Sequence, residues 1–481
     1  MKKFRLKHLF LVLAVFLIYV VLGCLIPFMH PKQVGDSFRA SFDTDAFYND
    51  SGTDSADRAA VVESSMDALN VRIQMIHQAK ERIVLSTFDI RAGQSCDDIF
   101  SSILEAADRG VKVRILVDGM YGSLHMNQEP IFYALGAHPD IEIKFYNTPN
   151  PLKPWTIHGR MHDKYLLIDD KLLLMGGRNT FDYFLGEYNM ENLSYDRDVL
   201  IYNTGHGQED AKSSAVWQTD RYFQDMWNSE YCETVFEQPS KSMKKKMPDA
   251  ESELRAHYLE LSARSPELTV PDFDYTDSTI PIKKATLIWN PTHIMGKEPW
   301  IWYQLEELMK QAEHRVYLHT PYAVFSQDMY DGMAETAGSV PDFKMMINSV
   351  AVGDNFMASS DYIFNKNKIL DTGVTVYEYN GSHSSHGKSM LIDHDISLIG
   401  SYNLDMRSTY VDTETMLVIH GEEFNKQLES HILALEEDAV RIEPDGTVAA
   451  DDAGKAKNVS RVKQLLFFVT SRLFQLFHYL I

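Results

Sequence analysis

The chain has 481 residues with 46 basic and 68 acidic side chains, which gives a formal net charge of −22. Its hydrophobic and aromatic contents, 44% and 11%, exclude wholesale disorder, and the acidic balance argues against a protein that grips a phosphate backbone electrostatically, although a local basic pocket is compatible with it. Three cysteines, Cys24, Cys96 and Cys232, are too few for a disulfide scaffold or a four-cysteine zinc site.

The N-terminal segment predicts a membrane anchor. Four basic residues precede residues 9–29, a run without charge that is about as long as a transmembrane helix. The basic flank places the N-terminus in the cytoplasm and the rest of the chain outside. A retained anchor is favoured over a cleaved signal peptide, because the apolar run exceeds a typical signal-peptide core. A lipoprotein is the third alternative, since residues 21–24 loosely resemble a lipobox, but the apolar run continues past Cys24.

Internal similarity indicates that the middle of the chain is a repeat. Residues 78–87 resemble residues 311–320, and both predict an amphipathic helix that runs into a buried strand. A helix over 97–108 and a strand over 111–117 follow in the first half, and 343–347 is the matching strand of the second half. Helices alternate with strands throughout, so the predicted fold class is α/β.

The sharper repeat is the pattern H-x-K-x4-D. Its two copies consist of His162, Lys164 and Asp169, and of His386, Lys388 and Asp393. A glycine-containing turn ends at Asn179 after the first copy and at Asn403 after the second, with a constant offset of 224 residues. Later, Asp198 and Glu414 each stand seven positions before a glycine. A single match to so short a motif often arises by chance. Two copies with identical spacing favour a functional motif over the alternative of two buried histidines on unrelated strands.

These residue types suit phosphodiester chemistry without a metal or other cofactor. A neutral imidazole can attack phosphorus to form a phosphohistidine, and a second imidazole can protonate the leaving alkoxide and later deprotonate an alcohol or water. Lysines and asparagines can hold the phosphoryl oxygens, and a carboxylate on the far ring nitrogen can fix the tautomer of each histidine. On a strand, the histidine and lysine share one face, whereas Asp169 and Asp393 lie opposite and are interpreted as structural supports.

A zinc site is the competing interpretation. It would use His158 and His162, or His383 and His386, or all four. It leaves both lysines and both asparagines unexplained, because lysine is not a zinc ligand.

The duplicated motif resembles the phospholipase D superfamily, and within it the chain is most similar to bacterial cardiolipin synthases and their relatives. The resemblance covers about residues 57–435 and rests on residues 160–164, 176–179 and 400–408. It implies a two-lobed pseudodimer, each lobe a mixed β-sheet flanked by helices, with the active site at the seam. By this resemblance His162 is the nucleophile and His386 the general acid and base. The remaining roles are phosphate binding by Lys164, Lys388, Asn179 and Asn403, and histidine orientation by Asp198 and Glu414.

Two departures from the family pattern stand out. The family often places Asn two residues before the second carboxylate, where this chain has Asp412. Residues 180–183 of the first half have no likeness to residues 405–408 of the second. Neither departure removes a predicted catalytic group.

The C-terminal segment predicts an amphipathic helix. Apolar residues recur at three- and four-residue steps at Val459, Val462, Leu466, Val469, Leu473, Leu476 and Leu480. The helix either lies on a membrane surface or docks on the core of the chain itself, and the period is compatible with both. The expected organisation is a cytoplasmic tip (1–8), an anchor (9–29), a linker (30–58), lobe 1 (59–236), an inter-lobe segment (237–285), lobe 2 (286–440), a linker (441–457) and this helix (458–481).

The preferred function is a single-pass, membrane-anchored phosphatidyltransferase with an extracytoplasmic catalytic domain. It would transfer a phosphatidyl group to phosphatidylglycerol and form cardiolipin. A phospholipase D that releases phosphatidic acid uses the same residues and is the main alternative. A nuclease is disfavoured, because single-strand binders use a basic groove with aromatics, and an inactive binding module is disfavoured by two intact motifs. The expected partners are phospholipids and the membrane, with no nucleic acid, while a protein partner is left open.

Overall fold

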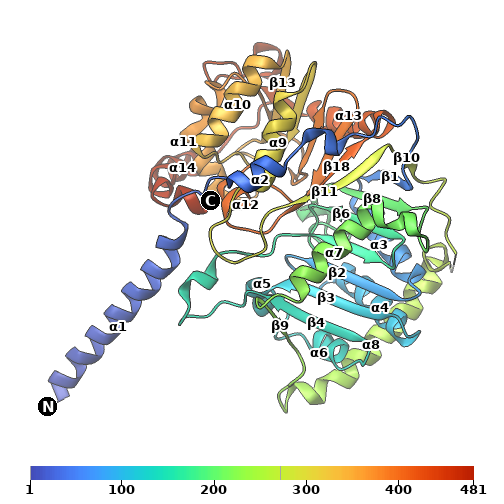
Figure 1. Cartoon of the computed structure of the whole chain (residues 1–481). Coiled ribbons are helices and arrows are strands. Elements are labelled where there is room, and N and C mark those ends of the chain that lie inside the picture. The colour runs from blue at the N-terminus through green and yellow to red at the C-terminus, as the bar shows by residue number, and fades with distance from the viewer. Residues whose placement is uncertain (1, 271) are drawn as a thin grey trace.

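A computed structural model describes residues 2–270 and 272–481 as two α/β lobes preceded by one long helix that projects away from them (Figure 1). Within that part of the chain, Lys7–Phe28 is the one helical segment long and apolar enough to cross a membrane. The projecting helix, α1 (Lys2–Leu25), leaves its apolar side chains exposed along most of its length.

Lobe 1 is built on a nine-stranded mixed sheet. The strand order is β10 (Ile280–Pro281), β1 (Asp57–Val62), β8 (Asp198–Asn203), β6 (Leu172–Gly176), β5 (Tyr165–Ile168), β2 (Arg82–Thr87), β3 (Lys112–Asp118), β4 (Ile141–Tyr146) and β9 (Cys232–Thr234). Only β2, β3 and β4 pair in parallel, because helical crossovers connect them. The outer face packs on α3 (Ser65–Gln78), α4 (Gln94–Asp108), α6 (Pro130–Gly136) and α8 (Met243–Arg264).

Lobe 2 repeats this plan with eight strands. Their order is β11 (Lys284–Trp289), β18 (Thr415–His420), β17 (Ile396–Gly400), β16 (Ser389–Ile392), β12 (Arg315–His319), β13 (Asp342–Asn348), β14 (Thr375–Tyr379) and β19 (Ala439–Arg441). Again three neighbours, β12 to β14, are parallel. The outer face packs on α9 (Trp300–Lys310), α10 (Gln327–Ser339) and α11 (Phe356–Leu370). The predicted α/β fold and two-lobed repeat are confirmed.

The inner faces of the two sheets meet in a shared core. Helices α7 (Ala215–Trp227) and α13 (Glu422–Glu436) contribute buried side chains to it, as do strands of both lobes. Along β5, Leu166 and Ile168 face the outer core while Tyr165 and Leu167 face the shared core, as the predicted alternation requires. The seam between the lobes is therefore a rigid, apolar interface on which a polar site can be positioned.

Short elements connect these layers. They are α2 (Asp36–Ser41), α5 (Gly119–His125), α12 (Met406–Tyr410), α14 (Arg461–Phe474), a parallel pair β7 (Ser194–Tyr195) and β15 (Ser384–Ser385), and the 3-10 helices η1 (Ile26–Phe28), η2 (Thr44–Phe47), η3 (Pro154–Ile157), η4 (Met190–Asn192), η5 (Glu209–Ser213), η6 (Pro266–Thr269), η7 (Ala450–Asp452) and η8 (Gln475–Leu480). The segment that joins α1 to lobe 1 lies on lobe 2, where Phe38 stacks on Trp300 at 4.7 Å and Phe47 enters the core. All three cysteines are free.

Candidate active site

Each motif histidine is bound by a carboxylate from the opposite lobe. Nδ1 of His162, in lobe 1, lies 2.8 Å from Oε1 of Glu414, in lobe 2. Nδ1 of His386, in lobe 2, lies 2.7 Å from Oδ2 of Asp196, in lobe 1. Both carboxylates are fully buried. In each histidine the carboxylate occupies Nδ1 and leaves Nε2 for a substrate.

Backbone pairing between the lobes sets this arrangement. Met161 forms a parallel bridge with Thr413, and the His162 N–H donates to the Thr413 carbonyl at 3.2 Å. In the symmetric position, β15 pairs with β7 and the His386 N–H donates to the Tyr195 carbonyl. The histidines therefore precede their strands, which begin at Tyr165 and Ser389, and the prediction that His162 and Lys164 lie within a strand is wrong. The backbone N–H of each histidine bonds to the other lobe, whereas the carbonyl of each motif lysine already accepts from the sheet of its own lobe.

The prediction that Asp198 orients a histidine is also wrong. Asp198 makes buried ion pairs with Arg72 at 2.9 Å and Arg178 at 3.1 Å. The sheet register explains the error: Gly176 pairs with Asp198, whereas the equivalent Gly400 pairs with Met416, two residues after Glu414. The counterpart of Glu414 is thus Asp196, and counting back from a glycine misplaced it by two residues.

The surroundings of His162 favour its neutral form. Burial lowers the pKa of His162 well below its ordinary value, and Lys164 and Lys388 lower it further. Burial raises the pKa of Glu414 well above its usual range, against the opposing effect of Lys164. Ser401 and Ser408 donate to the Glu414 carboxylate at 2.5 and 2.6 Å. Burial thus favours a neutral His162 imidazole; with its Nδ1–H donated to the Glu414 carboxylate, its Nε2 is unprotonated and can act as a nucleophile.

The surroundings of His386 differ in the pKa of the carboxylate, which is lowered for Asp196 and raised for Glu414. Burial opposes the charge on Asp196, yet Lys388, His386 and Arg178 together lower its pKa to about 2. Burial and Lys388 lower the pKa of His386, while Asp196 raises it. A carboxylate that stays charged stabilises the imidazolium form of its partner, as a general acid requires.

The lysines and asparagines complete a phosphate-sized set of donors. Nζ of Lys164 donates to the His162 carbonyl at 2.6 Å, and burial lowers the pKa of Lys164 to about 7. Nζ of Lys388 lies 3.1 Å from Nε2 of His386. Oδ1 of Asn179 and of Asn403 is buried without a hydrogen-bond partner in the described residues. The amide oxygen is an acceptor and cannot hold a phosphoryl oxygen, but no hydrogen bond within the described residues occupies either NH2 group, so both are available to donate to a ligand.

A cavity of about 730 Å³ opens at this site, with His386 and Asn179 in its wall. Aromatic rings form much of the rest. The Phe88 ring lies 4.9 Å from that of His162, and the Phe184 ring lies 5.1 Å from that of His386. Tyr322 also lines the cavity. These rings were not predicted from the sequence, although Phe88 follows the carboxyl end of β2, where α/β sheets commonly place ligand contacts.

Asp169 and Asp393 lie away from the histidines and support turns. Asp169 accepts hydrogen bonds from the backbone N–H groups of residues 80–82, and Asp393 from those of residues 313–315. Both have positive φ angles, 53° and 47°. These contacts agree with the interpretation of both aspartates as structural supports. They do not agree with counting Asp169 and Asp393 among the catalytic residues because they belong to the motif.

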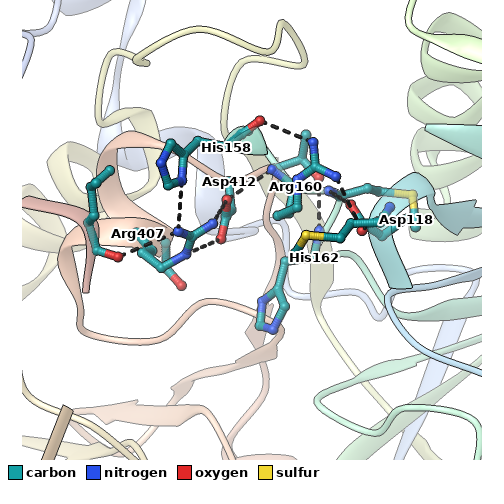
Figure 2. Close-up of polar contacts among 12 residues, drawn as sticks. Asp118, His158, Arg160, His162, Arg407 and Asp412 are labelled. Atoms are coloured by element: carbon teal, nitrogen blue, oxygen red, sulfur yellow. Dashed lines mark hydrogen bonds and ion pairs between the residues drawn. The ribbon is translucent and has the colours of Figure 1, made fainter. Parts of the chain in front are cut away.

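A second layer of charge surrounds the His162 segment (Figure 2). Asp412 accepts from the Arg160 N–H at 3.0 Å and forms an ion pair with Arg407 at 2.9 Å. Asp118 accepts from the Met161 N–H at 3.1 Å and lies 3.5 Å from the Arg160 guanidinium. The first departure from the family pattern, an acidic residue at 412, is thus matched by Arg407 from the 405–408 segment, which lobe 1 does not repeat.

The zinc alternative finds no support in this geometry. Within residues 2–270 and 272–481, no three His, Cys, Asp or Glu side chains gather as a metal site, so the four histidines do not converge. His158 instead packs against Phe28 at 5.1 Å between ring centres and lies 3.4 Å from Arg407.

Known proteins resemble this chain over the same regions. The family described as cardiolipin synthase, PLD-like domain, matches residues 72–227 and 305–435. Cardiolipin synthase C of Escherichia coli is 25% identical over 429 residues, covering 79% of this chain and 84% of that protein. An uncharacterized protein of Helicobacter pylori is 24% identical over 419 residues and is covered to 77%, as is this chain. The fold is similar to that of phosphatidylserine synthase from Haemophilus influenzae, with a TM-score of 0.62 at 16% identity over 88% of this chain and 95% of that one.

Two lobes that share one site built from a duplicated H-x-K motif define an enzyme of the phospholipase D superfamily. Within it, the chain belongs to the cardiolipin synthase, PLD-like family. The resemblance identified from the motifs is thereby confirmed.

Proposed function

We propose that this protein is a membrane-anchored phosphatidyltransferase of the cardiolipin synthase type, which acts through a phosphohistidine. The observation that carries the proposal is the reciprocal exchange of carboxylates between the lobes, which binds Nδ1 of each histidine and leaves neither Nε2 bound to a carboxylate. The proposal also draws on the family and on the relative named cardiolipin synthase C.

In the first half-reaction, Nε2 of His162 attacks the phosphorus of a phosphatidylglycerol. A phosphorus–nitrogen bond forms and the bond from phosphorus to the glycerol headgroup oxygen breaks. His386 gives its Nε2 proton to the departing alkoxide, so that glycerol leaves. Lys164, Lys388 and the two asparagine amides hold the phosphoryl oxygens as charge develops on them.

In the second half-reaction, a headgroup hydroxyl of another phosphatidylglycerol attacks the same phosphorus. His386 takes the hydroxyl proton, the phosphorus–nitrogen bond breaks, and cardiolipin is released. With water in place of the hydroxyl, the product is phosphatidic acid, which is the phospholipase D alternative. The acceptor alone distinguishes the two reactions.

The proposed anchor is the apolar helix that ends at Phe28. The basic flank before it favours a cytoplasmic N-terminus and therefore an extracytoplasmic catalytic domain. Protease added to intact cells should then cleave the lobes, and complete protection would contradict this orientation.

The decisive experiment reconstitutes the full chain in vesicles that contain phosphatidylglycerol and identifies products by mass spectrometry. We expect cardiolipin and glycerol in equal amounts. Phosphatidic acid without cardiolipin would establish the hydrolase instead. His162→Ala should abolish the reaction and the labelled phosphoenzyme, whereas His386→Ala should slow turnover and let the phosphoenzyme accumulate with a substrate whose leaving group needs no proton. Full activity of His162→Ala would refute the assigned nucleophile.

A further inference from the structure

Helix α14 packs on the protein with its less apolar side. Phe467 stacks on Phe356 of α11 at 4.8 Å. Phe474, at the end of α14, also packs on Phe356. The remaining contacts are polar: the hydroxyl groups of Thr470 and Ser360 are 3.0 Å apart, and the buried carboxylate of Asp361 binds two side chains from the residues that follow α14. A helix of a soluble protein normally buries its whole apolar stripe, whereas this one docks two aromatic rings and leaves a row of aliphatic side chains exposed.

The apolar stripe of the segment faces outward. It consists of Val462, Leu465, Leu466, Val469, Leu473 and Leu476, whose exposed fractions lie between 50% and 79%. The five that belong to α14 fall within about 100° of one another around the helix axis. Six exposed aliphatic side chains in one row are far more than the scattered apolar residues of an ordinary surface, and they mark an interaction surface. We call these six residues the outer stripe.

The outer stripe adjoins the end of the proposed anchor. Phe28, at the end of the apolar helix, belongs to one buried cluster with Ile481, and Phe474 and Leu480 pack against that cluster. Figure 1 shows α1 leaving the body beside α14. If α1 crosses the bilayer, the contact with Phe28 holds the C-terminal segment at the bilayer surface.

The same segment adjoins the active-site cavity. Phe356, which stacks on α14, lines that cavity, and so does the neighbouring Met357, which is 41% exposed. Tyr322 packs against the cluster that contains Phe28 and lies 6.2 Å from His386, ring to ring. The C-terminal segment that carries the outer stripe is therefore joined by direct contacts to the anchor and to the cavity wall.

Charge identifies the surface that the stripe fits. Arg461, Lys463 and Arg472 lie on α14 and Lys457 precedes it, in a chain whose net charge is −22. Lys457 and Arg472 line a groove of about 640 Å³ between α11 and α14, whose walls include Ile363 and Phe364. Exposed apolar residues flanked by cations are the composition of helices that lie in the headgroup region of anionic membranes.

We infer that the outer stripe of α14 is immersed in the same anionic bilayer that α1 crosses, and that it holds the cavity entrance at the lipid headgroups. This inference rests on the proposed function for its bilayer substrate. It combines the two sequence interpretations of the C-terminal segment, since the helix docks on the lobe with one face and contacts the membrane with the opposite face.

The test measures immersion of the full chain in vesicles of phosphatidylcholine and phosphatidylglycerol by electron paramagnetic resonance. Nitroxide labels are placed singly by Leu466→Cys, Val469→Cys and, as the matched control on another face, Gln464→Cys. The background carries Cys24→Ser and Cys232→Ser, while Cys96 is fully buried. Both stripe labels should collide with oxygen and be shielded from a water-soluble nickel complex, whereas the control label should remain open to nickel.

Three outcomes would overturn the inference. Equal nickel access at all three labels would mean that the stripe stays in water. Shielding from both quenchers together with dipolar broadening would mean that a second copy covers the stripe. Equal immersion in vesicles of phosphatidylcholine alone would refute the part assigned to the basic residues. None of these measurements needs catalysis, so a failure of the proposed reaction leaves their result interpretable.

A functional readout completes the test. The double substitution Leu466→Glu and Val469→Glu should lower activity on vesicles about tenfold or more and leave activity on detergent-dispersed phosphatidylglycerol within about twofold, because only a bilayer surface is lost. Gln464→Glu should change neither activity. An equal loss in vesicles and detergent would place the effect in the active site and contradict the inference.

Discussion

Replacing Asp196 by asparagine should slow turnover about a thousandfold and leave the fold intact. The side chains have the same shape, so the substitution removes a charge 2.7 Å from Nδ1 of His386 and little else. An ion pair with charge centres about 4 Å apart contributes about 4 kcal/mol at an effective dielectric constant near 20. That stabilisation of the imidazolium corresponds to about 10³ in rate. An amide facing Nδ1 also favours the wrong tautomer.

Single-turnover kinetics on detergent-dispersed phosphatidylglycerol, normalised to folded protein, measure this effect. The matched control is Asp198→Asn, two residues away. It breaks a buried pair with Arg72 and Arg178, so we expect about 3 kcal/mol of lost stability in chemical denaturation and nearly normal turnover per folded molecule. If Asp196→Asn turned over within about threefold of the unmodified enzyme, or if Asp198→Asn lost as much turnover while folded, the reasoning about the carboxylates would be refuted.

Three further predictions concern the surroundings. Gly177→Ala places a Cβ 2.3 Å from the Asp196 carboxylate and should lower kcat about tenfold or more. Gly205→Ala, whose nearest neighbour is 3.3 Å away, should leave kcat unchanged. Equal kcat values for the two variants would contradict the claim that the new Cβ displaces Asp196. Burial lowers the pKa of Lys164 to about 7, so kcat/KM should fall as the pH rises above 7 and the lysine loses its charge; a flat profile to pH 9 would contradict this. Asp361→Ala removes the buried anchor of the C-terminal segment and should speed limited proteolysis after residue 457, and unchanged cleavage would show that the polar contacts do not hold α14.

The repeat and its chemistry were predictable because they depend on local spacing. Parity predicted that Asp169 would lie apart from His162 and Lys164, although only residues 165–168 between them form the strand. Asp169 follows that strand in a turn, where its carboxylate accepts from three backbone N–H groups.

Asp196 was not predictable from spacing, because the loop between the asparagine turn and the carboxylate differs between the lobes. Asp196 stands 17 positions after Asn179, whereas Glu414 stands 11 positions after Asn403. Only pairing between strands fixes which residue reaches the histidine. The exposure of the apolar stripe of α14 could not be predicted from the sequence for a related reason. A helical period shows which residues share a face but not what covers that face.

The crossed carboxylates also mean that neither half of the chain possesses a complete proton-transfer pair. The half of the chain before the inter-lobe segment contains His162 and Asp196, but these two side chains do not bind each other. His162 binds Glu414 and Asp196 binds His386, both in the other half. Any movement that parts the lobes deprives both histidines of their carboxylates at the same moment. Catalysis therefore requires that the two lobes stay in contact. An enzyme whose lobes have separated loses both half-reactions and not only one.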